Sequence, residues 1–209
     1  MTLPPWEVEL LQFAEFATDP YTFCVDLQPH LRAVSDGSDC HETQGAFGWS
    51  MQNEFGATVA TGMGPVRGGG RVTSYRAEAY GMLSILRFLI RMAEFTEMQI
   101  PCNGMIVATD SQSVLDTLFG HDELRREKGR DEPINLSELS IILNCLSPAW
   151  DNLIEIQAVL SQLPNIRLAY EIGHQDRNRS YHELDEVGQL KNVDADAKAS
   201  EYQDAHGEN

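Results

Sequence analysis

Basic residues are scarce in this sequence. Its 209 residues include 15 Lys and Arg against 32 Asp and Glu, which gives a formal net charge of −17 at pH 7. A protein with this balance does not hold a phosphate backbone by charge attraction alone, because that attraction comes from Lys and Arg. The charge favours cations or basic partners instead.

Cysteine and long apolar runs are also scarce. The four cysteines form no Cys-x-x-Cys pair, which argues against the common zinc and redox motifs and favours free thiols in a reducing compartment. The longest apolar stretch, 80–93, is broken by Arg87 and Arg91, and the opening residues are acidic rather than basic. We therefore expect an intracellular protein of the cytoplasm or nucleus, with no secretory signal and no membrane span.

The hydrophobic pattern predicts an α/β fold. Short strands typical of an antiparallel meander fall at 31–35, 45–51 and 58–63. Further strands are predicted at 105–109 and 166–172, and helices at 75–94, 113–119, 148–163 and from about 192. This order implies a mixed sheet flanked by helices. In the 148–163 helix, Trp150 and Ile154 are expected to face inward.

Four carboxylates fall at strand ends and helix starts, where α/β folds place their chemistry. They are Asp36 after the first strand, Glu78 one turn into the long helix, Asp110 after the buried strand, and Asp196 in the first turn of the last helix. Each alone also fits a turn, a cap or a solvated position. Converging carboxylates at buried strand ends repel one another and are costly to desolvate. A hard divalent cation, which prefers oxygen ligands, removes both difficulties.

Five short motifs stand around these carboxylates in a fixed order. They are Asp-Gly-Ser at 36–38, Ser-Tyr-Arg-Ala-Glu at 74–78, Thr-Asp-Ser-Gln at 109–112, Gly-His at 173–174 and Asn-x-x-Ala-Asp at 192–196. Together they resemble ribonuclease H, in particular the type 1 domains attached to retroelement reverse transcriptases. The resemblance spans about 31–202 and implies a five-stranded mixed sheet, three antiparallel strands followed by two parallel ones, flanked by helices.

The resemblance implies a two-metal endonuclease that hydrolyses the RNA strand of RNA/DNA hybrids. Two Mg²⁺ ions are implied, and Mn²⁺ fits the same ligands. Asp36 would bridge both ions, Asp196 would hold the ion that activates water, and Glu78 with Asp110 would complete the other. His174 matches a mobile catalytic histidine that is suited by its pKa to move a proton or to help the product leave.

The resemblance also implies residues that contact the substrate. Gln112 matches a residue that contacts the RNA 2′-hydroxyl, the group that distinguishes RNA from DNA. Ser74 and Tyr75 stand where two asparagines often touch the hybrid, and Ser111 and Asn192 are assigned to the substrate by their places in the motifs. The implied partners are an RNA/DNA hybrid and a reverse transcriptase domain on a parent or separate chain, with no membrane contact.

The motifs divide the chain into three parts. Residues 1–30 are expected to form an acidic appendage with a short helix, 31–202 the catalytic domain, and 203–209 a disordered tail. His174 and Asp196 are 22 residues apart, so 175–191 is interpreted as an insertion before the last helix. Asp194 either replaces an acidic residue that is common just before the Ala-Asp pair or only caps the helix.

Alternatives to a hybrid nuclease remain open at this point. The first is a catalytically idle ribonuclease H-like module that serves as a structural or nucleic-acid-binding part of a retroelement remnant. The second keeps the fold with different chemistry. An integrase would favour a final Glu over Asp196, and a 3′–5′ exonuclease would favour an acid at the position of Ser38.

Overall fold

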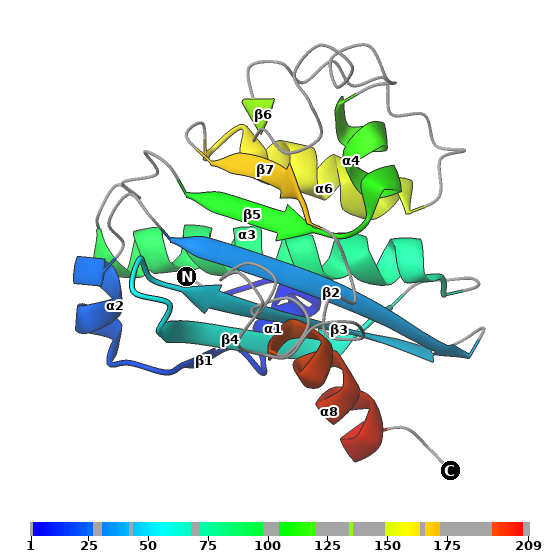
Figure 1. Ribbon diagram of the computed structural model, residues 1–209, viewed down its shortest axis with the longest axis horizontal. Coiled ribbons are helices and arrows are strands. Elements are labelled where there is room, and N and C mark those ends of the chain that lie inside the picture. The colour runs from blue at the N-terminus through cyan, green and yellow to red at the C-terminus, as the bar shows by residue number, and fades with distance from the viewer. Residues whose placement is uncertain are drawn as a thin grey trace.

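The computed structural model describes residues 2–26, 31–41, 44–67, 72–97, 105–119, 134–135, 149–163, 166–171 and 194–206. Its secondary structure is a single mixed sheet with helices on both faces (Figure 1). Within these ranges, no helix combines the length and apolar character that crossing a lipid bilayer requires. The segment interpreted as an insertion, 175–191, lies outside the described residues.

The sheet has the predicted mixed topology. The described strands lie in the order β1-β4-β3-β2-β5-β7-β6. Their bounds are β1 Glu15–Phe16, β2 Arg32–His41, β3 Gln44–Gln52, β4 Thr58–Pro65, β5 Ile106–Thr109, β6 Ile134–Asn135 and β7 Arg167–Tyr170. The strands β2, β3 and β4 are antiparallel, whereas β5 runs parallel to β2 and β7 parallel to β5. The prediction of three antiparallel and two parallel strands is confirmed, and the two-residue strands β1 and β6 extend the sheet at its edges.

The helices cover both faces of this sheet. Their bounds are α1 Pro5–Leu11, α2 Pro20–Asp26, α3 Ser74–Thr96, α4 Gln112–Phe119, α6 Trp150–Leu160 and α8 Asp196–His206. Trp49 of β3 packs toward α3 and donates a hydrogen bond from Nε1 to Ser84 Oγ at 2.9 Å. Gly48, the preceding residue, lies against α8. Because successive strand residues point to opposite faces, α3 and α8 sit on opposite sides of the sheet, as Figure 1 shows.

The long helix α3 forms the centre of the core. The hydroxyl of Thr73 caps its start by accepting a hydrogen bond from the Arg76 N–H at 3.2 Å. Its apolar face is buried, and it comprises Ala79, Met82, Leu83, Leu86, Leu89 and Ile90. Burial of each larger side chain on this face stabilises the folded protein by roughly 1.5–3 kcal/mol. This burial holds α3 firmly against the sheet.

The N-terminal segment shares this core. Leu10 and Phe23 are buried with the residues of α3, and β1 pairs with β4 at one edge of the sheet. The carboxylate of Glu7, which is fully buried, accepts hydrogen bonds of 2.7 and 2.6 Å from Arg91 on α3. Hydrogen bonding to Glu7 raises the pKa of Arg91. The short helix expected here corresponds to α1, whereas β1 and α2 are additional elements.

Three local predictions are wrong. The strand expected at 31–35 continues to His41 as β2, so Asp36 lies within the strand rather than after it. The helix α8 continues to His206, so residues 203–206 are helical rather than a disordered tail, while 207–209 lie outside the described residues. Trp150 and Ile154 of α6 are 42% and 40% exposed instead of facing the core. Both line a groove of about 400 Å³ that also borders Trp6 of α1, and α6 turns Leu153 and Ile156 to the core instead.

Candidate active site

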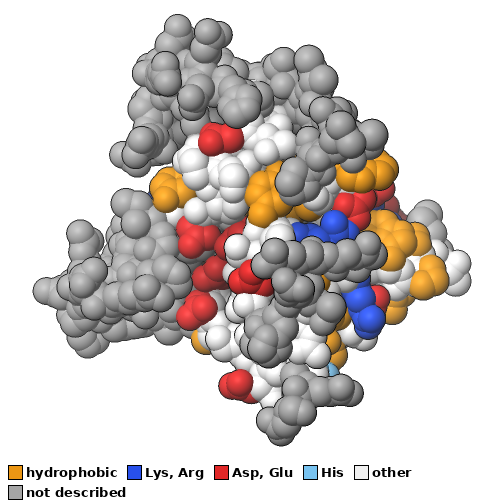
Figure 2. Space-filling model, turned by 90° about the vertical axis from the view of Figure 1, so that its right-hand side faces the viewer, with side chains coloured by type: hydrophobic (Ala, Val, Ile, Leu, Met, Phe, Trp, Pro, Cys, Tyr) orange, Lys and Arg blue, Asp and Glu red, His pale blue; other side chains and the backbone are white. Residues whose placement is uncertain are grey.

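A cavity of about 680 Å³ opens where β2 and β5 meet the starts of α3, α4 and α8. Its charged lining consists of acids, namely Asp36, Asp39, Glu78, Asp110, Asp116 and Asp196. Among the described residues, none that lines this cavity is Lys or Arg. Figure 2 shows the end of the molecule toward which β5 points, where acidic side chains gather near the centre.

Three of these acids form a compact group. Asp36, Glu78 and Asp110 each offer one carboxylate oxygen, and these three atoms lie within 4.8 Å of one another. Asp36 is 9% exposed and Glu78 is 6% exposed, whereas Asp110 is half-buried. The sequence-predicted convergence of these three residues is therefore present in the fold.

A glycine and a strand register bring the three together. A Cβ atom on Gly37 would lie 2.4 Å from the backbone nitrogen of Glu78 and 2.5 Å from the carbonyl carbon of Ala77. Only glycine allows the start of α3 to approach β2 so closely, which sets Glu78 beside Asp36. The parallel strands β2 and β5 pair Ser35 with Thr109, so the next residues, Asp36 and Asp110, emerge side by side.

Hydrogen bonds orient these carboxylates. Thr109 Oγ1 donates to Glu78 Oε2 at 2.8 Å, and the backbone N–H of Gly37 donates to Asp36 Oδ1 at 2.8 Å. The N–H of Ser111 in turn donates to Thr109 Oγ1 at 3.2 Å, which leaves that hydroxyl's own proton for Glu78. These donors hold the carboxylates of Glu78 and Asp36 in fixed orientations.

Asp196 lines the same cavity but stands apart from the compact group. Its helix is placed by Gly48, the cross-strand partner of Asp36. A Cβ on Gly48 would lie 2.3 Å from the Ala195 carbonyl oxygen and 2.5 Å from the Ala199 nitrogen. The glycine thus lets α8 settle directly on β3, on the strand position opposite Asp36.

Asp194 anchors the start of α8 to the sheet. Its Oδ2 atom accepts hydrogen bonds from Ser50 Oγ at 3.2 Å and from Thr58 Oγ1 at 3.3 Å. The side chain is therefore directed at β3 and β4. The local sequence pattern does not reveal this contact, because Ser50 and Thr58 lie on strands far from Asp194 in the sequence.

The donor set of the compact group fits a hard divalent cation. All three side chains offer oxygen, their oxygens are close enough to share one centre, and two of the three are almost buried. Mg²⁺ and Mn²⁺ prefer carboxylate oxygens and water, whereas softer metals favour sulfur or imidazole. A bound cation would also relieve the repulsion between carboxylates held at this separation.

Four of the predicted substrate residues line the cavity, namely Ser74, Tyr75, Ser111 and Gln112. The Tyr75 hydroxyl donates to Thr117 Oγ1 at 3.0 Å, and burial raises the pKa of Tyr75, so the phenol stays neutral at physiological pH. The other two predictions, His174 and Asn192, lie outside the described residues.

Two cavity acids were not singled out from the sequence. Asp39 lies on β2 and Asp116 on α4, and both line the cavity. Asp116 accepts a 2.6 Å hydrogen bond from Gln112 Nε2. For Asp116 the sequence contained a signal, because it follows Gln112 by one helical turn and residues i and i+4 share a helix face.

Comparison with known proteins bears on the fold. The sequence matches no protein-family model and no curated protein. Among solved structures, RNase H1 from the halophilic archaeon Halobacterium salinarum NRC-1 superposes with a TM-score of 0.52 at 19% identity, over 84% of this chain and 98% of that one. The fold is that of ribonuclease H.

Two further structures agree with this assignment. LC11-RNase H1, solved in complex with an RNA/DNA hybrid, gives a TM-score of 0.53 at 13% identity, over 84% of this chain and 97% of that one. The protease-reverse transcriptase of prototype foamy virus gives 0.51 at 21% identity, over 88% of this chain and 22% of the longer viral chain. The likeness therefore extends to a type 1 enzyme and to a domain-sized part of a reverse transcriptase chain.

Proposed function

We propose that this protein is an endonuclease that hydrolyses the RNA strand of RNA/DNA hybrids with the help of two divalent cations. The observation that carries the proposal is the compact group of Asp36 on β2, Glu78 on α3 and Asp110 after β5, whose carboxylate oxygens lie within 4.8 Å of one another in a ribonuclease H fold. The described residues that line the cavity include acids and no Lys or Arg, so they would repel a phosphate group. Bound cations would reverse this repulsion and let the phosphate enter.

Each carboxylate has a role that matches its position. Asp36 belongs to the compact group and also pairs across the strands with Gly48, the β3 position on which α8 rests, which suits it to serve both cations. Glu78 and Asp110 would complete the shell of one cation, and Asp196 would hold the other. Bound Mg²⁺ or Mn²⁺ would polarise the scissile phosphate, activate the attacking water and neutralise the leaving oxygen. His174 is proposed to move a proton or to assist product release.

Neutral polar groups beside the carboxylates would contact the hybrid. Ser74, Tyr75, Ser111 and Gln112 line the cavity and bring hydroxyl and amide groups to it. Such groups suit contacts with sugar hydroxyls and phosphate oxygens, and Gln112 is proposed to contact the RNA 2′-hydroxyl. Asn192 is proposed as a further substrate contact from its place in the motif.

The acidic charge suggests that a partner delivers the substrate. With a net charge of −17, the isolated chain is expected to bind hybrid weakly and only with divalent metal. The likeness to the viral protease-reverse transcriptase supports a retroelement origin and a reverse transcriptase domain as the partner, on a parent chain or a separate one. A basic surface on that partner would supply the charge that this chain lacks.

The deciding experiment is cleavage of a labelled RNA/DNA hybrid by the purified chain. The unchanged protein should cut the RNA strand internally with Mg²⁺ or Mn²⁺ and lose activity in EDTA. Asp110→Asn should abolish cleavage and leave the folded structure intact, because the side chain is half-buried and keeps its size. Unchanged cleavage by Asp110→Asn would refute the assignment of this site.

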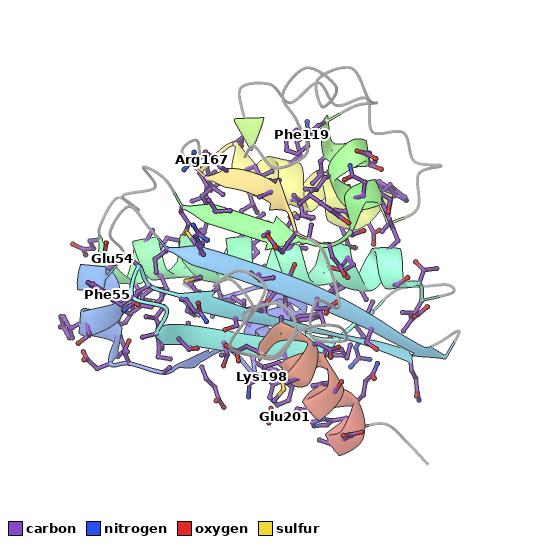
Figure 3. All side chains as sticks on the ribbon, in the orientation of Figure 1. Glu54, Phe55, Phe119, Arg167, Lys198 and Glu201 are labelled. Atoms are coloured by element: carbon purple, nitrogen blue, oxygen red, sulfur yellow. The ribbon has the colours of Figure 1, made fainter. Side chains whose placement is uncertain are left out.

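A matched control is Glu54→Gln, which removes one carboxylate far from the cavity. Glu54 and Phe55 lie at the turn between β3 and β4, at the end of the molecule opposite to the one that β5 points to (Figure 3). This variant should cleave as fast as the unchanged protein. A well-folded protein that binds hybrid and cuts nothing would instead indicate the catalytically idle module, and cutting confined to DNA ends would indicate an exonuclease.

A further inference from the structure

The helix α4 carries a pair of residues that faces the cavity as a unit. Gln112 and Asp116 are one helical turn apart, both line the cavity, and Gln112 Nε2 donates to Asp116 Oδ1 at 2.6 Å. Short hydrogen bonds to a charged acceptor are stronger than those between neutral groups. The amide of Gln112 is therefore held rather than free to rotate.

The helix beneath the pair is itself fixed. Val114, Leu115 and Leu118 of α4 are fully buried against the core. On its outer side, Thr117 Oγ1 donates to the Ser113 carbonyl at 2.8 Å and accepts a hydrogen bond from Tyr75 of α3. Asp116 thus occupies a defined position relative to the carboxylates on β2, α3 and β5.

The chemistry of a carboxylate decides which way the amide points. An ionised Asp only accepts hydrogen bonds, so only the NH₂ group of Gln112 can face it. The amide oxygen of Gln112 is then the atom left for the substrate. An acceptor at this place matches the donor proton of a ribose 2′-hydroxyl, which a deoxyribose lacks.

We propose that Asp116 is a positioning residue that fixes the Gln112 amide with its oxygen toward the substrate, and so sets the preference for an RNA strand. This inference rests on the proposed function. It assigns to Asp116 an indirect role, exerted through Gln112, and predicts that Gln112 alone would discriminate poorly between ribose and deoxyribose.

The test is a series of hybrids that differ by one 2′-deoxynucleotide at successive positions around the cleaved bond. For the unchanged protein, one position should lower kcat/KM by about tenfold, the effect of one lost hydrogen bond. Gln112→Ala should lose this sensitivity. Asp116→Asn should reduce it to less than about twofold, because an Asn amide can accept or donate and no longer dictates how the Gln112 amide points.

The control is Asp39→Asn, which removes the same charge from the same cavity but from β2 instead of α4. Whatever its overall rate, Asp39→Asn should keep the full sensitivity to the 2′-deoxy substitution. The sensitivity is the ratio of kcat/KM for two hybrids measured on one protein preparation. A partly unfolded variant therefore gives the same ratio as a fully folded one.

Three results would overturn the inference. The first is an Asp116→Asn protein that keeps the sensitivity while Gln112→Ala loses it, and the second is an Asp39→Asn protein that loses it as well. The third is an unchanged protein that cleaves hybrid and shows no sensitive position, which leaves the proposed function intact. Absence of any cleavage by the unchanged protein would remove the proposed function and the inference together.

Discussion

Two regions of the molecule supply the acidic side chains of the cavity, and they are built differently. Glu78 belongs to α3, which buries residues along most of its length, from Ala77 to Met92. Asp196 belongs to α8, in which Ala199 is the one buried residue of the described helix. The compact group is therefore fixed by the core, whereas the fourth carboxylate depends on a helix that rests on the surface of the sheet.

The site thus has a core half, the compact group of Asp36, Glu78 and Asp110, and a surface half, Asp196 on α8. The difference indicates how each half responds to mutation and to cation binding. Core packing holds the compact group in place before any cation binds, because moving Glu78 would require moving α3. Among the described residues, α8 buries Ala199 alone, and it is held on the sheet by the close approach of Gly48, by the Asp194 anchor and by a 3.4 Å hydrogen bond from Ser38 Oγ to Gln203. Lightly packed elements open at low free energy, so the position of Asp196 should be the more adjustable part.

The largest expected effect is a difference in cleavage activity between a mutation in the compact group and a mutation of Asp196. Asp36→Asn should lower kcat/KM for hybrid cleavage by at least about a thousandfold, because several kcal/mol of charge stabilisation depend on the compact group. Asp196→Asn should lower it by about 10–100-fold, since that residue stands outside the group. Steady-state kinetics at saturating Mg²⁺ measures both, with Glu54→Gln as the control. Equal losses would show that the four acids act as one unit.

Two glycine substitutions separate the halves by stability. Gly37→Ala places a Cβ against the backbone of α3 and should lower the free energy of unfolding by about 1–3 kcal/mol, with a loss of cleavage as Glu78 shifts. Gly48→Ala pushes against α8, which can move outward, so cleavage should fall while the free energy of unfolding drops by less than about 1 kcal/mol. Denaturant unfolding and initial rates, measured on both variants, check this. A larger stability loss for Gly48→Ala would place α8 in the core.

The sequence predicts the core half of the site better than the surface half. Periodicity locates Asp110 directly after β5 and Glu78 in the second turn of α3, and the parallel register of β2 and β5 brings Asp36, which lies within β2, beside Asp110. The separation of Asp196 from the group depends on how α8 rests on the sheet, which no local pattern encodes. His174 and Asn192 remain predictions, because both lie outside the described residues.

The wrong predictions for residues 203–206 and for Trp150 have a similar cause. Residues 203–206 are predicted as part of a disordered tail, yet they continue α8. Ring contacts of Tyr202 and His206 with Phe13, at centroid distances of 5.5 and 5.6 Å, hold the end of α8 against the N-terminal segment. The helical pattern of 148–163 predicts Trp150 in the core, yet it lies at a groove between helices. Both outcomes depend on contacts between distant segments, which periodicity does not report.

The smallest expected effect concerns the anchor of α8. Asp194→Ala removes the acceptor for Ser50 and Thr58, so the free energy of unfolding should fall by about 1 kcal/mol and the amides of the first turn of α8 should exchange faster with solvent. The Mg²⁺ concentration for half-maximal cleavage should rise a few-fold, because Asp196 follows the anchor by two residues. Hydrogen exchange and a Mg²⁺ titration measure the two effects.

Asp204→Ala provides the control, because it removes an exposed carboxylate from the same helix at a distance from the anchor. A double-mutant cycle between Asp194→Ala and Ser50→Ala should give a coupling of about 0.5 kcal/mol or more, since the two side chains share a hydrogen bond. If Asp194→Ala accelerates exchange in α8 and leaves the Mg²⁺ titration unchanged, the position of Asp196 is set by Gly48 and the body of the helix rather than by its first turn. In that case the surface half of the site is more rigid than its sparse burial suggests.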